Sequence, residues 1–472
     1  MKIKLPSLVE KTMNVLEQSG YETYVVGGSV RGIMSQQKVK DWDFTTSATP
    51  EQIQAVFPES FYENNFGTVG VKVEELDKQL SASSTDLTKE GLSPDDVFEI
   101  TTYRTEGRYS DNRRPDKVSW GKTVIEDLKR RDFTINAMAI RKPTESDEYE
   151  LLDPFDGQSD LKSGLIRAVG KPVERFTEDA LRMLRAVRIA SEAGYLIEKI
   201  TLKAISENAS LMAKVSWERR SDELLKVVVG DFSVDGLKLL LSTNLLEHLL
   251  PELIPSVGVE QGGHHTKDVW HHSIDAMANC PSRDAIVRLA TLLHDVGKPN
   301  AFRRLNNKIT FYGHEVVGGR IVKSIGERLH LSKKDQQRLY KLVRYHMFVY
   351  EPKMSDAGIR RFIRRVGLEN INDMIMLRIG DRVGGGSRQT SWRLREFQER
   401  IGKVLYTPMQ VKDLKVSGHD VMKVMEVSGG PEVGKVLSVL FEEVMEDSSK
   451  NTKKYLMGKL LQLKNEMKSE RR

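Results

Sequence analysis

The sequence predicts an α+β domain at its N-terminus followed by all-α segments, and three observations lead to this fold class. As far as about residue 170, short runs of β-branched residues end at glycine turns, as in 24–28 and 67–73. Beyond that point apolar residues recur every three or four positions, as at Leu237, Leu241 and Leu245, which is typical of helices. A length of 472 residues also exceeds one ordinary domain. We therefore expect a mixed-sheet head (1–170), a helical neck (171–260), a histidine-rich helical unit (261–385) and a basic helical tail (386–472).

The composition is that of a soluble protein. No apolar run approaches the roughly 18 residues that a membrane-spanning helix requires, so we exclude a transmembrane protein. The N-terminal residues lack the apolar core and the cleavage site of a signal peptide, which predicts a cytoplasmic location. The single cysteine, Cys280, excludes an intrachain disulfide and suits a reducing compartment. Its simplest interpretation is a small core residue.

Positive charge slightly exceeds negative charge, with 73 Lys and Arg against 67 Asp and Glu and a net charge of +6. This balance permits an anionic partner, and the clustering of cations carries more information. Arginines are concentrated in 104–114 and in the segment that holds Arg182, Arg185 and Arg188. Basic residues also fill the tail from Lys453 onward. A solvated helix face explains the tail equally well, so RNA binding there is one of two interpretations.

A glycine turn near the N-terminus could bind phosphate. Residues 24–26 read as a buried strand that ends at Gly27 and Gly28, and Ser29 can cap a short helix containing Arg31. A glycine turn that opens a helix presents free N–H groups to a phosphate. Taken alone, such a turn is more often an ordinary tight turn.

Two aspartates downstream make a phosphate-binding turn more plausible than an ordinary tight turn. Residues two apart in a strand point to the same face, so the carboxylates of Asp41 and Asp43 would project together toward the turn. Adjacent carboxylates repel each other unless cations bind between them. Paired Mg²⁺ ions would remove this cost, activate an attacking 3′ hydroxyl and stabilise a leaving pyrophosphate. Glu99, in a predicted strand at 97–104, is the natural third metal ligand because its apolar neighbours occupy the other face.

Two polar segments flank that strand. Residues 74–96 are rich in Ser, Thr, Asp and Lys and lack helix or strand periodicity, so we interpret them as a surface insertion. Residues 104–115 carry four arginines and are too polar for a core.

From about residue 20 to 230 the chain resembles the class II tRNA nucleotidyltransferases, the family of CCA-adding enzymes and bacterial poly(A) polymerases. The motifs that carry the resemblance stand in the family's order: the Gly-Gly turn with Asp41 and Asp43, the run 130–137, the turn 153–157 with Asp160, the segment 178–182, and 218–220 with 222–224. The third motif implies a hinge-like turn between head and neck. Gly32 departs from the pattern, because the family usually has Asp at this position.

The resemblance also implies a nucleotide site. Arg131 and Asp132 would contact the ribose or the triphosphate of the incoming nucleotide. The full set of residues expected at the nucleotide comprises Gly27, Gly28, Ser29, Arg31, Arg131, Asp132, Asn136, Asp179, Arg182, Arg185 and Arg188.

Asp179 and Arg182 suit recognition of a base. Thr177 can cap a helix whose first turn holds Glu178 and Asp179, and Arg182 would lie on the same face. A surface ion pair is the simpler interpretation of these residues in isolation. In the family, the corresponding Asp and Arg bond to the base edge in place of a template. A carboxylate beside a guanidinium can pair with C or A and complements G and U poorly.

Two features favour complete CCA addition among the activities of this family. Residues 61–69 lack the basic run that poly(A) polymerases of this class usually carry. Residues 104–115 keep a full-length loop, which enzymes that add only the two cytidines tend to lack. The implied partners are tRNA, CTP and ATP. An enzyme that adds only the terminal A and a poly(A) polymerase stay open as alternatives.

The unit 261–385 is dense in histidine. His294 and Asp295 follow an apolar segment, so both would lie at the end of a helix beside the core. A lone histidine on an apolar helix is usually structural, but histidines and aspartates spread over four helical segments suit a divalent metal. The pattern resembles the HD phosphohydrolase superfamily. This resemblance implies His272, His294, Asp295 and Asp381 as ligands of a metal of unknown identity, with His314 and His346 available for a second ion.

The role of this unit has several interpretations. It could hydrolyse phosphoesters, such as 2′,3′-cyclic phosphate ends, or only help to hold RNA. A hydrolytic RNA-repair protein whose head only binds, and a hydrolase of signalling nucleotides, are competing functions. The favoured hypothesis is a CCA-adding nucleotidyltransferase that could also have an HD phosphohydrolase activity.

Overall fold

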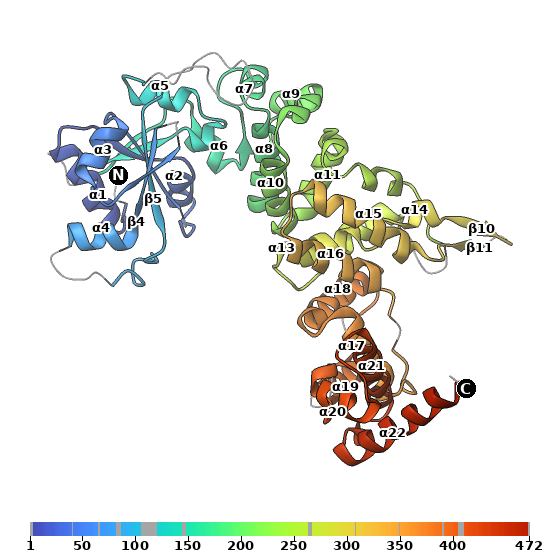
Figure 1. Ribbon diagram of the computed structural model, residues 1–472. Helices are drawn as coiled ribbons and strands as arrows, with labels where there is room; N and C mark the ends of the chain where they lie inside the picture. Colours follow the sequence, from blue (N-terminus) through green and yellow to red (C-terminus); the bar gives the residue numbers. More distant parts are fainter. Residues whose placement is uncertain are drawn as a thin grey trace. The chain divides into compact units, whose positions relative to one another are not determined.

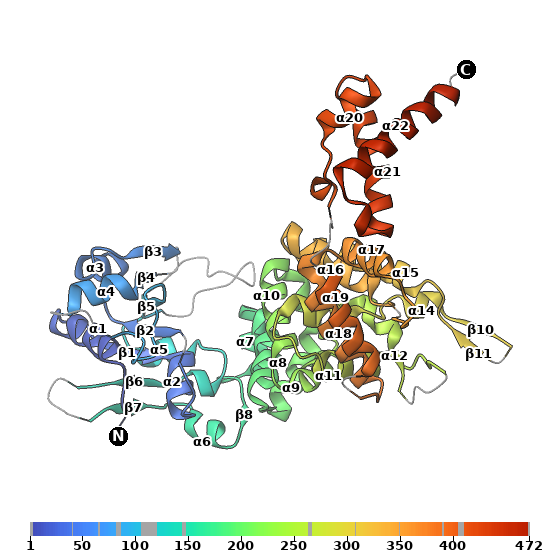
Figure 2. The same ribbon diagram turned by 90° about the horizontal axis from the view of Figure 1, so that it is seen from below.

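The computed structural model divides into two compact units, Met1–Ile254 and Pro255–Arg472, and each is considered by itself. It describes residues 3–39, 41–64, 67–81, 86–104, 120–143, 148–262, 267–306, 308–348, 350–388, 391–404 and 410–470. Figures 1 and 2 show the elements in two views. Among the described residues, no helix combines the length and the apolar character needed to cross a bilayer.

The first unit begins with a mixed sheet that has seven strands within the described residues. The strands are β1 (Thr23–Val26), β2 (Trp42–Thr46), β3 (Phe61–Asn64), β4 (Thr68–Lys72), β5 (Val97–Thr102), β6 (Ala139–Arg141) and β7 (Glu150–Leu152). Their order is β3-β4-β5-β2-β1-β6-β7, in which β2 and β5 are parallel and the other neighbours antiparallel. The head therefore has the predicted α+β class.

Two apolar clusters cover the two faces of this sheet. Helices α1 (Ser7–Gln18), α3 (Pro50–Val56) and α4 (Val73–Leu80) pack with Phe44 and Ile100 in the larger cluster. Tyr24 and Val26 belong to the smaller cluster, which includes α5 (Val124–Lys129). Because successive side chains of a strand alternate between faces, the neighbours of Phe44 and Ile100 point away from the larger cluster.

The parallel pairing of β2 and β5 brings two acidic residues together. Asp43 is the direct partner of Glu99 in the register of these strands. Directly paired residues share a face of the sheet, so both side chains lie opposite the larger apolar cluster. The face with the smaller cluster is consequently the one that carries the charged groups.

The prediction for residues 74–96 was wrong at its beginning. Helix α4 occupies Val73–Leu80, with Val73 and Leu76 buried, and it contacts α1 and β4. A helix this short contains too few apolar positions for its period to be recognised among charged residues. Residues 87–91 form turns, and 82–85 lie outside the described residues.

The head ends at a turn with several restraints. The Asp153 carboxylate accepts the N–H of Gly157 at 2.7 Å. A Cβ at Gly157 would lie 2.3 Å from the carbonyl oxygen of Thr134, so only glycine fits this close approach. The buried carboxylate of Asp160 accepts the Thr134 hydroxyl at 2.6 Å and pairs with Arg167 at 3.0 Å. The turn predicted to be hinge-like is therefore packed against the motif at 130–137.

The neck is helical and remains joined to the head. It contains α7 (Pro172–Glu178), α8 (Leu181–Ala193), α9 (Lys199–Asn208), α10 (Trp217–Val229) and α11 (Ser233–Ser242). A short parallel pair links β8 (Leu165–Ile166) with β9 (Leu196–Ile197). The N–H of Glu198 extends this pairing by donating to the carbonyl of Ile166 at 2.9 Å. The pair therefore crosses the domain boundary that we placed at residue 170.

The second unit begins with the histidine-rich helices. They are α12 (Val269–Ala278), α13 (Ala285–Leu293), α14 (Lys298–Ala301), α15 (His314–Arg328), α16 (Lys333–Tyr345), α17 (Asp356–Val366) and α18 (Ile371–Gly384). Helix α12 contacts α13 and α18, and α13 also contacts α16. An antiparallel hairpin, β10 (Arg303–Leu305) and β11 (Lys308–Thr310), lies between α14 and α15 in the chain.

The C-terminal segment has an apolar core of its own. Its helices are α19 (Trp392–Val404), α20 (Gly418–Met425), α21 (Pro431–Glu446) and α22 (Lys453–Glu470). Leu440, Phe441 and Leu456 are among its buried core residues. Lys464 pairs with Glu426 at 2.7 Å, so part of the positive charge that the sequence showed here is balanced within the protein.

Candidate active site and metal centre

Asp43 lies directly beside the glycine turn. Gly27 opens α2 (Gly27–Met34) immediately after β1 and has a φ of +68°, a conformation that favours glycine. A Cβ at this position would lie 3.2 Å from Asp43 Oδ2 and 3.1 Å from a guanidinium nitrogen of Arg131. The absence of a side chain at Gly27 therefore lets the backbone approach both charged groups.

Ser29 has a different role from the one predicted. It lies inside α2, whose N-cap is Val26 and has no side-chain cap, so the capping prediction was wrong. The buried Ser29 hydroxyl donates to the carbonyl oxygen of Asp41 at 2.9 Å and accepts the N–H of Asp43 at 3.0 Å. One hydroxyl thus holds the backbone of both aspartates against the turn.

The charge on Asp43 is unfavourable in this surrounding. Burial raises the pKa of Asp43, Arg131 opposes this rise, and Asp41 adds to it. Asp41 is exposed and precedes β2, whereas Glu99 is an exposed residue within β5. The ligand atoms of Asp41, Asp43 and Glu99 do not all lie within 4.8 Å of one another. Adjacent carboxylates of this kind attract a cation, because a cation relieves their repulsion.

The motif at 130–137 forms a charged network with the neck. Asp132 is buried, and its carboxylate accepts Nδ2 of Asn136 at 3.0 Å and Nε of Arg185 at 2.6 Å. Burial raises the pKa of Asp132, but Arg185 and the hydrogen bond from Asn136 outweigh it and hold that pKa well below its usual range. Arg31 of α2 donates to Oδ1 of Asn136. These contacts connect the glycine turn to α8.

Asp127 belongs to the same charged region, although we did not predict it. Its fully buried carboxylate pairs with Arg130 at 2.8 Å and with Arg131 at 3.1 Å. Burial raises the pKa of Asp127, but the two arginines outweigh it and lower that pKa to about 2. Asp127 therefore orients Arg131 toward Gly27. An acid three and four residues before two arginines was the available signal, although α5 ends just before these arginines. Most of the loop 104–115 lies outside the described residues.

The local prediction at Asp179 was wrong. Helix α7 ends at Glu178 and α8 begins at Leu181, so Asp179 lies between two helices and not in a first turn. Thr177 lies within α7, where its hydroxyl donates to the carbonyl of Val173. The Asp179 carboxylate accepts the N–H of Leu181 at 3.0 Å and pairs with Arg219 of α10 at 2.7 Å.

Arg182 has partners other than Asp179. Its guanidinium pairs with Glu178 at 2.6 Å and donates to the carbonyl of Arg130 at 2.8 Å. Nearby, Arg188 pairs with Glu223 at 2.8 Å. The sequence alone could not predict the pairing of Asp179 with Arg219, because 40 residues separate them along the chain. Asp179 and Arg182 are nonetheless both held at the start of α8 by fixed partners.

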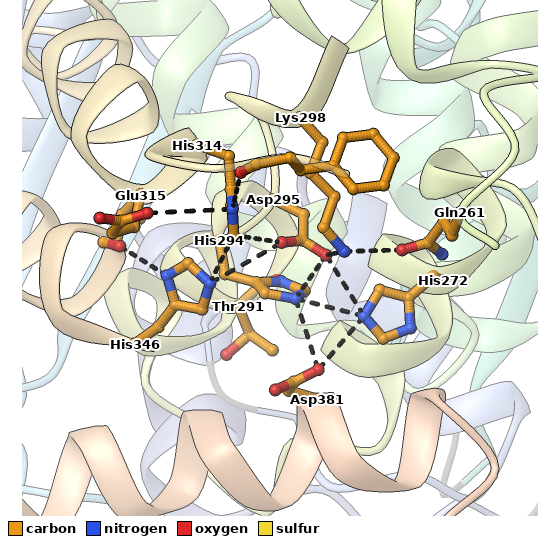
Figure 3. A network of polar contacts seen from close by, with 12 residues as sticks. Gln261, His272, Thr291, His294, Asp295, Lys298, His314, Glu315, His346 and Asp381 are labelled. Atoms are coloured by element: carbon orange, nitrogen blue, oxygen red, sulfur yellow. Dashed lines mark hydrogen bonds and ion pairs between the residues drawn. The ribbon is translucent and has the colours of Figure 1, made fainter. Parts of the chain in front are cut away.

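Six predicted ligands meet in the second unit (Figure 3). His272 comes from α12, Asp381 comes from α18, and His294 and Asp295 directly follow α13 as predicted. His314 begins α15, and His346 directly follows α16. These residues form two sets, and within each set the ligand atoms all lie within 4.8 Å of one another. The first set is His272, His294 and Asp381. The second set is Asp295, His314 and His346.

Asp295 belongs to the second set and also lies beside the first. Its Oδ2 is 3.1 Å from Nε2 of His294 and 3.5 Å from Nε2 of His272. Its Oδ1 is 3.2 Å from Nε2 of His314 and 3.7 Å from Nε2 of His346. One carboxylate therefore faces both sets and could supply a ligand atom to an ion held by either.

Backbone carbonyls orient three of these histidines. The Nδ1 atoms of His294, His314 and His346 lie 2.7 Å, 2.9 Å and 2.7 Å from the carbonyl oxygens of Thr291, Phe311 and Val343. A donor at Nδ1 leaves the lone pair on Nε2 directed into the cluster. Metal-ligating histidines commonly have this second hydrogen bond, which fits the residues to a divalent cation.

The charges around this cluster are strongly coupled. Burial lowers the pKa of His294, but the carboxylates of Asp295 and Asp381 outweigh it and raise that pKa to about 10. Lys298 pairs with Asp295 at 2.6 Å, and Arg378 pairs with Asp381 at 2.6 Å. The sequence analysis did not identify these two cations. Both line the cavity of about 780 Å³ that contains the cluster, where they could neutralise a phosphoryl group.

Comparisons with known proteins agree with this organisation. Four family models match in succession: the poly A polymerase head domain at residues 23–167, the probable RNA and SrmB-binding site of polymerase A at 194–256, the HD domain at 262–383, and a putative tRNA nucleotidyltransferase domain 2 at 386–460. The fold and the two sites thus define a polymerase-type nucleotidyltransferase head followed by an HD domain.

Curated relatives give the family. A CCA-adding enzyme of Lactococcus lactis subsp. lactis is 30% identical over 458 residues, covering 95% of this chain and 96% of that protein. The chain belongs to the family of CCA-adding enzymes. One from Limosilactobacillus reuteri is 42% identical over 252 residues, and this match spans 52% of this chain and 57% of that protein.

Solved structures share the fold. The CCA-adding enzyme of Bacillus stearothermophilus in complex with CTP has a TM-score of 0.70 at 24% identity, and the match covers 98% of each chain. The Thermotoga maritima CCA-adding enzyme, complexed with tRNA, has a TM-score of 0.55 at 18% identity and covers 98% of this chain and 99% of that one.

Proposed function

We propose that this protein adds C, C and A to the 3′ end of tRNA from CTP and ATP without a nucleic-acid template. The observation that carries the proposal is the position of Asp43 beside the glycine turn, held there with Asp41 by Ser29. The family supports the same activity, since its members are named for CCA addition. The four predicted domains, 1–170, 171–260, 261–385 and 386–472, would divide polymerisation, base selection, HD chemistry and RNA binding among them.

The carboxylates of the head would hold Mg²⁺. Carboxylate oxygens are the ligands that Mg²⁺ prefers, and burial already makes the charge on Asp43 costly without a cation. Two such ions supply activation of the 3′ hydroxyl and stabilisation of the leaving pyrophosphate. Glu99, the register partner of Asp43, is the remaining carboxylate on this face of β2 and β5 that we assign to the metal site.

The other residues of the head would bind and orient the triphosphate. The N–H groups at the start of α2 and the guanidinium of Arg131 lie next to Asp43, where a phosphate would be bound. Asp127 keeps Arg131 in this position through their ion pair. Asp132 and Asn136 connect this region to α8, so the triphosphate site and the base-selecting residues belong to one network.

The glycine turn gives the first testable prediction. We expect Gly27→Ala to reduce nucleotide addition by about tenfold to a hundredfold, because the φ of +68° is unfavourable for alanine and its Cβ would press on Asp43 and Arg131. Initial rates with saturating tRNA and CTP would test this. Gly20→Ala, also at positive φ but with nothing within 4 Å of its Cβ, is the matched control and should retain the wild-type rate.

Arg182 gives a prediction about specificity. We expect Arg182→Ala to lose discrimination between CTP or ATP and the other two nucleotides while retaining residual transfer, because a donor fork to the base edge would be missing. Single-nucleotide incorporation with each of the four triphosphates measures this. Unchanged selectivity would reject the templating role. Glu192→Ala, which removes an exposed side chain of the same helix that belongs to no predicted site, controls for damage to α8.

Extension assays would separate the members of the family. tRNA ending before CC, before A, and complete would each be mixed with one nucleotide at a time. A CCA-adding enzyme extends the first with CTP and the second with ATP, and leaves complete tRNA unchanged. An A-adding enzyme extends only the second substrate, and a poly(A) polymerase extends all three with ATP.

Binding of tRNA should be mainly electrostatic. The arginines of the loop 104–115 and the basic residues of the tail would contact phosphates, so affinity should fall steeply as salt concentration rises. A role in tRNA maturation suits the cytoplasm, where we propose that the protein is located.

A second function is favoured by the cluster in the second unit. The two sets of ligands joined by Asp295 fit two divalent cations, which would polarise a phosphoryl oxygen and activate water. Arg378 and Lys298 would neutralise the phosphoryl charge. We therefore assign a phosphoester hydrolase activity to this unit, with RNA 3′ ends among its possible substrates. Removal of a blocking phosphate would restore the 3′ hydroxyl that the head extends.

A further inference from the structure

A second cavity adjoins the metal centre within the same unit. Arg382 and Ser387 line the cavity of the metal centre and also a separate cavity of about 840 Å³. The remaining lining residues of the second cavity are Arg388, Ser391, Trp392, Arg395, Glu396 and Glu399. We call it the Trp392 groove. It runs from the end of α18 to the first turns of α19, so a ligand that fills both cavities would extend away from the metal centre.

The aromatic ring in this groove is unusually accessible. Trp392 is 61% exposed, although indole is among the side chains that gain most from burial. The guanidinium of Arg393 lies 5.4 Å from the centre of the ring and so covers one face at most. An exposed aromatic face is the surface on which proteins stack an unpaired nucleobase, with little dependence on which base it is.

Cations accompany the ring. Arg382, Arg388 and Arg395 supply three guanidinium groups, against the carboxylates of Glu396 and Glu399. Nε of Arg382 is buried and has no hydrogen-bond partner among the residues that the structure describes. Guanidinium groups bind phosphate through paired N–H donors. Stacking surface and guanidinium groups together are what a single-stranded nucleic acid requires from its binding groove.

We propose that the Trp392 groove binds single-stranded RNA just upstream of a 3′ end whose terminal phosphate lies at the metal centre. This inference rests on the proposed hydrolase function and names its substrate class as RNA ends in preference to free nucleotides. In the reaction, water adds to phosphorus, the bond from phosphorus to the terminal ribose oxygen breaks, and that oxygen takes a proton. The products are inorganic phosphate and a free 3′ hydroxyl.

Binding tests the groove without requiring turnover. The probe is a 3′-phosphorylated RNA hexamer with a 5′ fluorophore, titrated into the full chain and followed by anisotropy. We expect Trp392→Ala to weaken binding about tenfold, as loss of one stacked base does, and Trp392→Phe to retain most of it. Leu368→Ala, which removes a similarly exposed apolar side chain just before α18, should bind like wild type. Equal binding by wild type and Trp392→Ala would overturn the proposal.

A hydrolysis assay then distinguishes a failure of this inference from a failure of the proposed hydrolase function. Wild type should release phosphate faster from the hexamer than from a 3′-phosphorylated mononucleotide, and in Trp392→Ala this preference should fall about tenfold. If wild type prefers the mononucleotide, the groove is not part of the substrate site and the inference fails. If wild type hydrolyses neither probe, the hydrolase assignment fails, and the anisotropy result alone decides whether the groove binds RNA.

Discussion

Replacing Asp43 by Asn is expected to reduce nucleotide addition at least about a thousandfold. The substitution keeps the shape of the side chain but removes the negative charge that would hold Mg²⁺ beside the glycine turn. Metal-ion catalysis supplies several kcal/mol of charge stabilisation, and each 1.36 kcal/mol corresponds to about a tenfold change in rate. Single-turnover incorporation of CTP into tRNA that lacks its 3′ end is the appropriate measurement, because it separates the chemical step from product release.

Stability should move in the opposite direction from activity. Burial and Asp41 raise the pKa of Asp43 in spite of Arg131, so neutralising this side chain removes an unfavourable charge. We expect Asp43→Asn to unfold at the same temperature as wild type or slightly higher in the absence of divalent cations. Glu74→Gln, at an exposed carboxylate of α4, is the matched control and should leave both quantities unchanged. Activity of Asp43→Asn within tenfold of wild type would remove the basis of the proposed polymerase site.

Replacing His294 by Ala is expected to abolish phosphoester hydrolysis and leave nucleotide addition intact. His294 supplies Nε2 to the set with His272 and Asp381, and this atom lies 3.1 Å from Oδ2 of Asp295. Losing one of four proposed protein ligands should lower metal affinity by more than the 10- to 100-fold typical of changes in the outer shell. Metal content after dialysis and hydrolysis of a chromogenic phosphomonoester both measure the effect.

The two activities provide internal controls for each other. The head and the HD domain lie in different compact units, so Asp43→Asn should hydrolyse like wild type and His294→Ala should add nucleotides like wild type. His271→Ala, next in the chain to a ligand but outside both ligand sets, controls for the loss of a histidine from α12. Hydrolysis by His294→Ala at the wild-type rate would show that this cluster is not the hydrolytic centre.

Local sequence patterns predicted most of what this fold shows. The histidine cluster could be recognised because His294 and Asp295 end a strongly apolar segment, and an apolar helix end is a local feature. The two aspartates were predicted from their two-residue spacing in a strand, and Asp43 does lie in β2, whereas Asp41 precedes this strand. The position of Asp295 beside both ligand sets was not predictable, since it depends on the distance between α15 and α13 and not on any spacing along the chain.

Predictions failed where a long-range contact outweighs a local preference. Ser29 has the residue type of a helix cap, but its hydroxyl instead binds the backbone at Asp41 and Asp43. Asp179 has a nearby arginine in the sequence, yet it pairs with Arg219 across the neck. In both cases the partner lies on another element, so the periodicity of one segment contains no information about it.

The β8–β9 pair determines how the head could be exchanged between relatives. Leu165 and Ile166 pair with β9, which follows α8 in the chain. Ala168 forms an isolated antiparallel β-bridge with Phe133. A chimaera joined at residue 170 would take the two strands from different parents, so the side chains that pack around this pair would no longer match. Grafts that move residues 1–198 as one block keep both strands from one parent, and such hybrids should unfold at a higher temperature than those joined at residue 170.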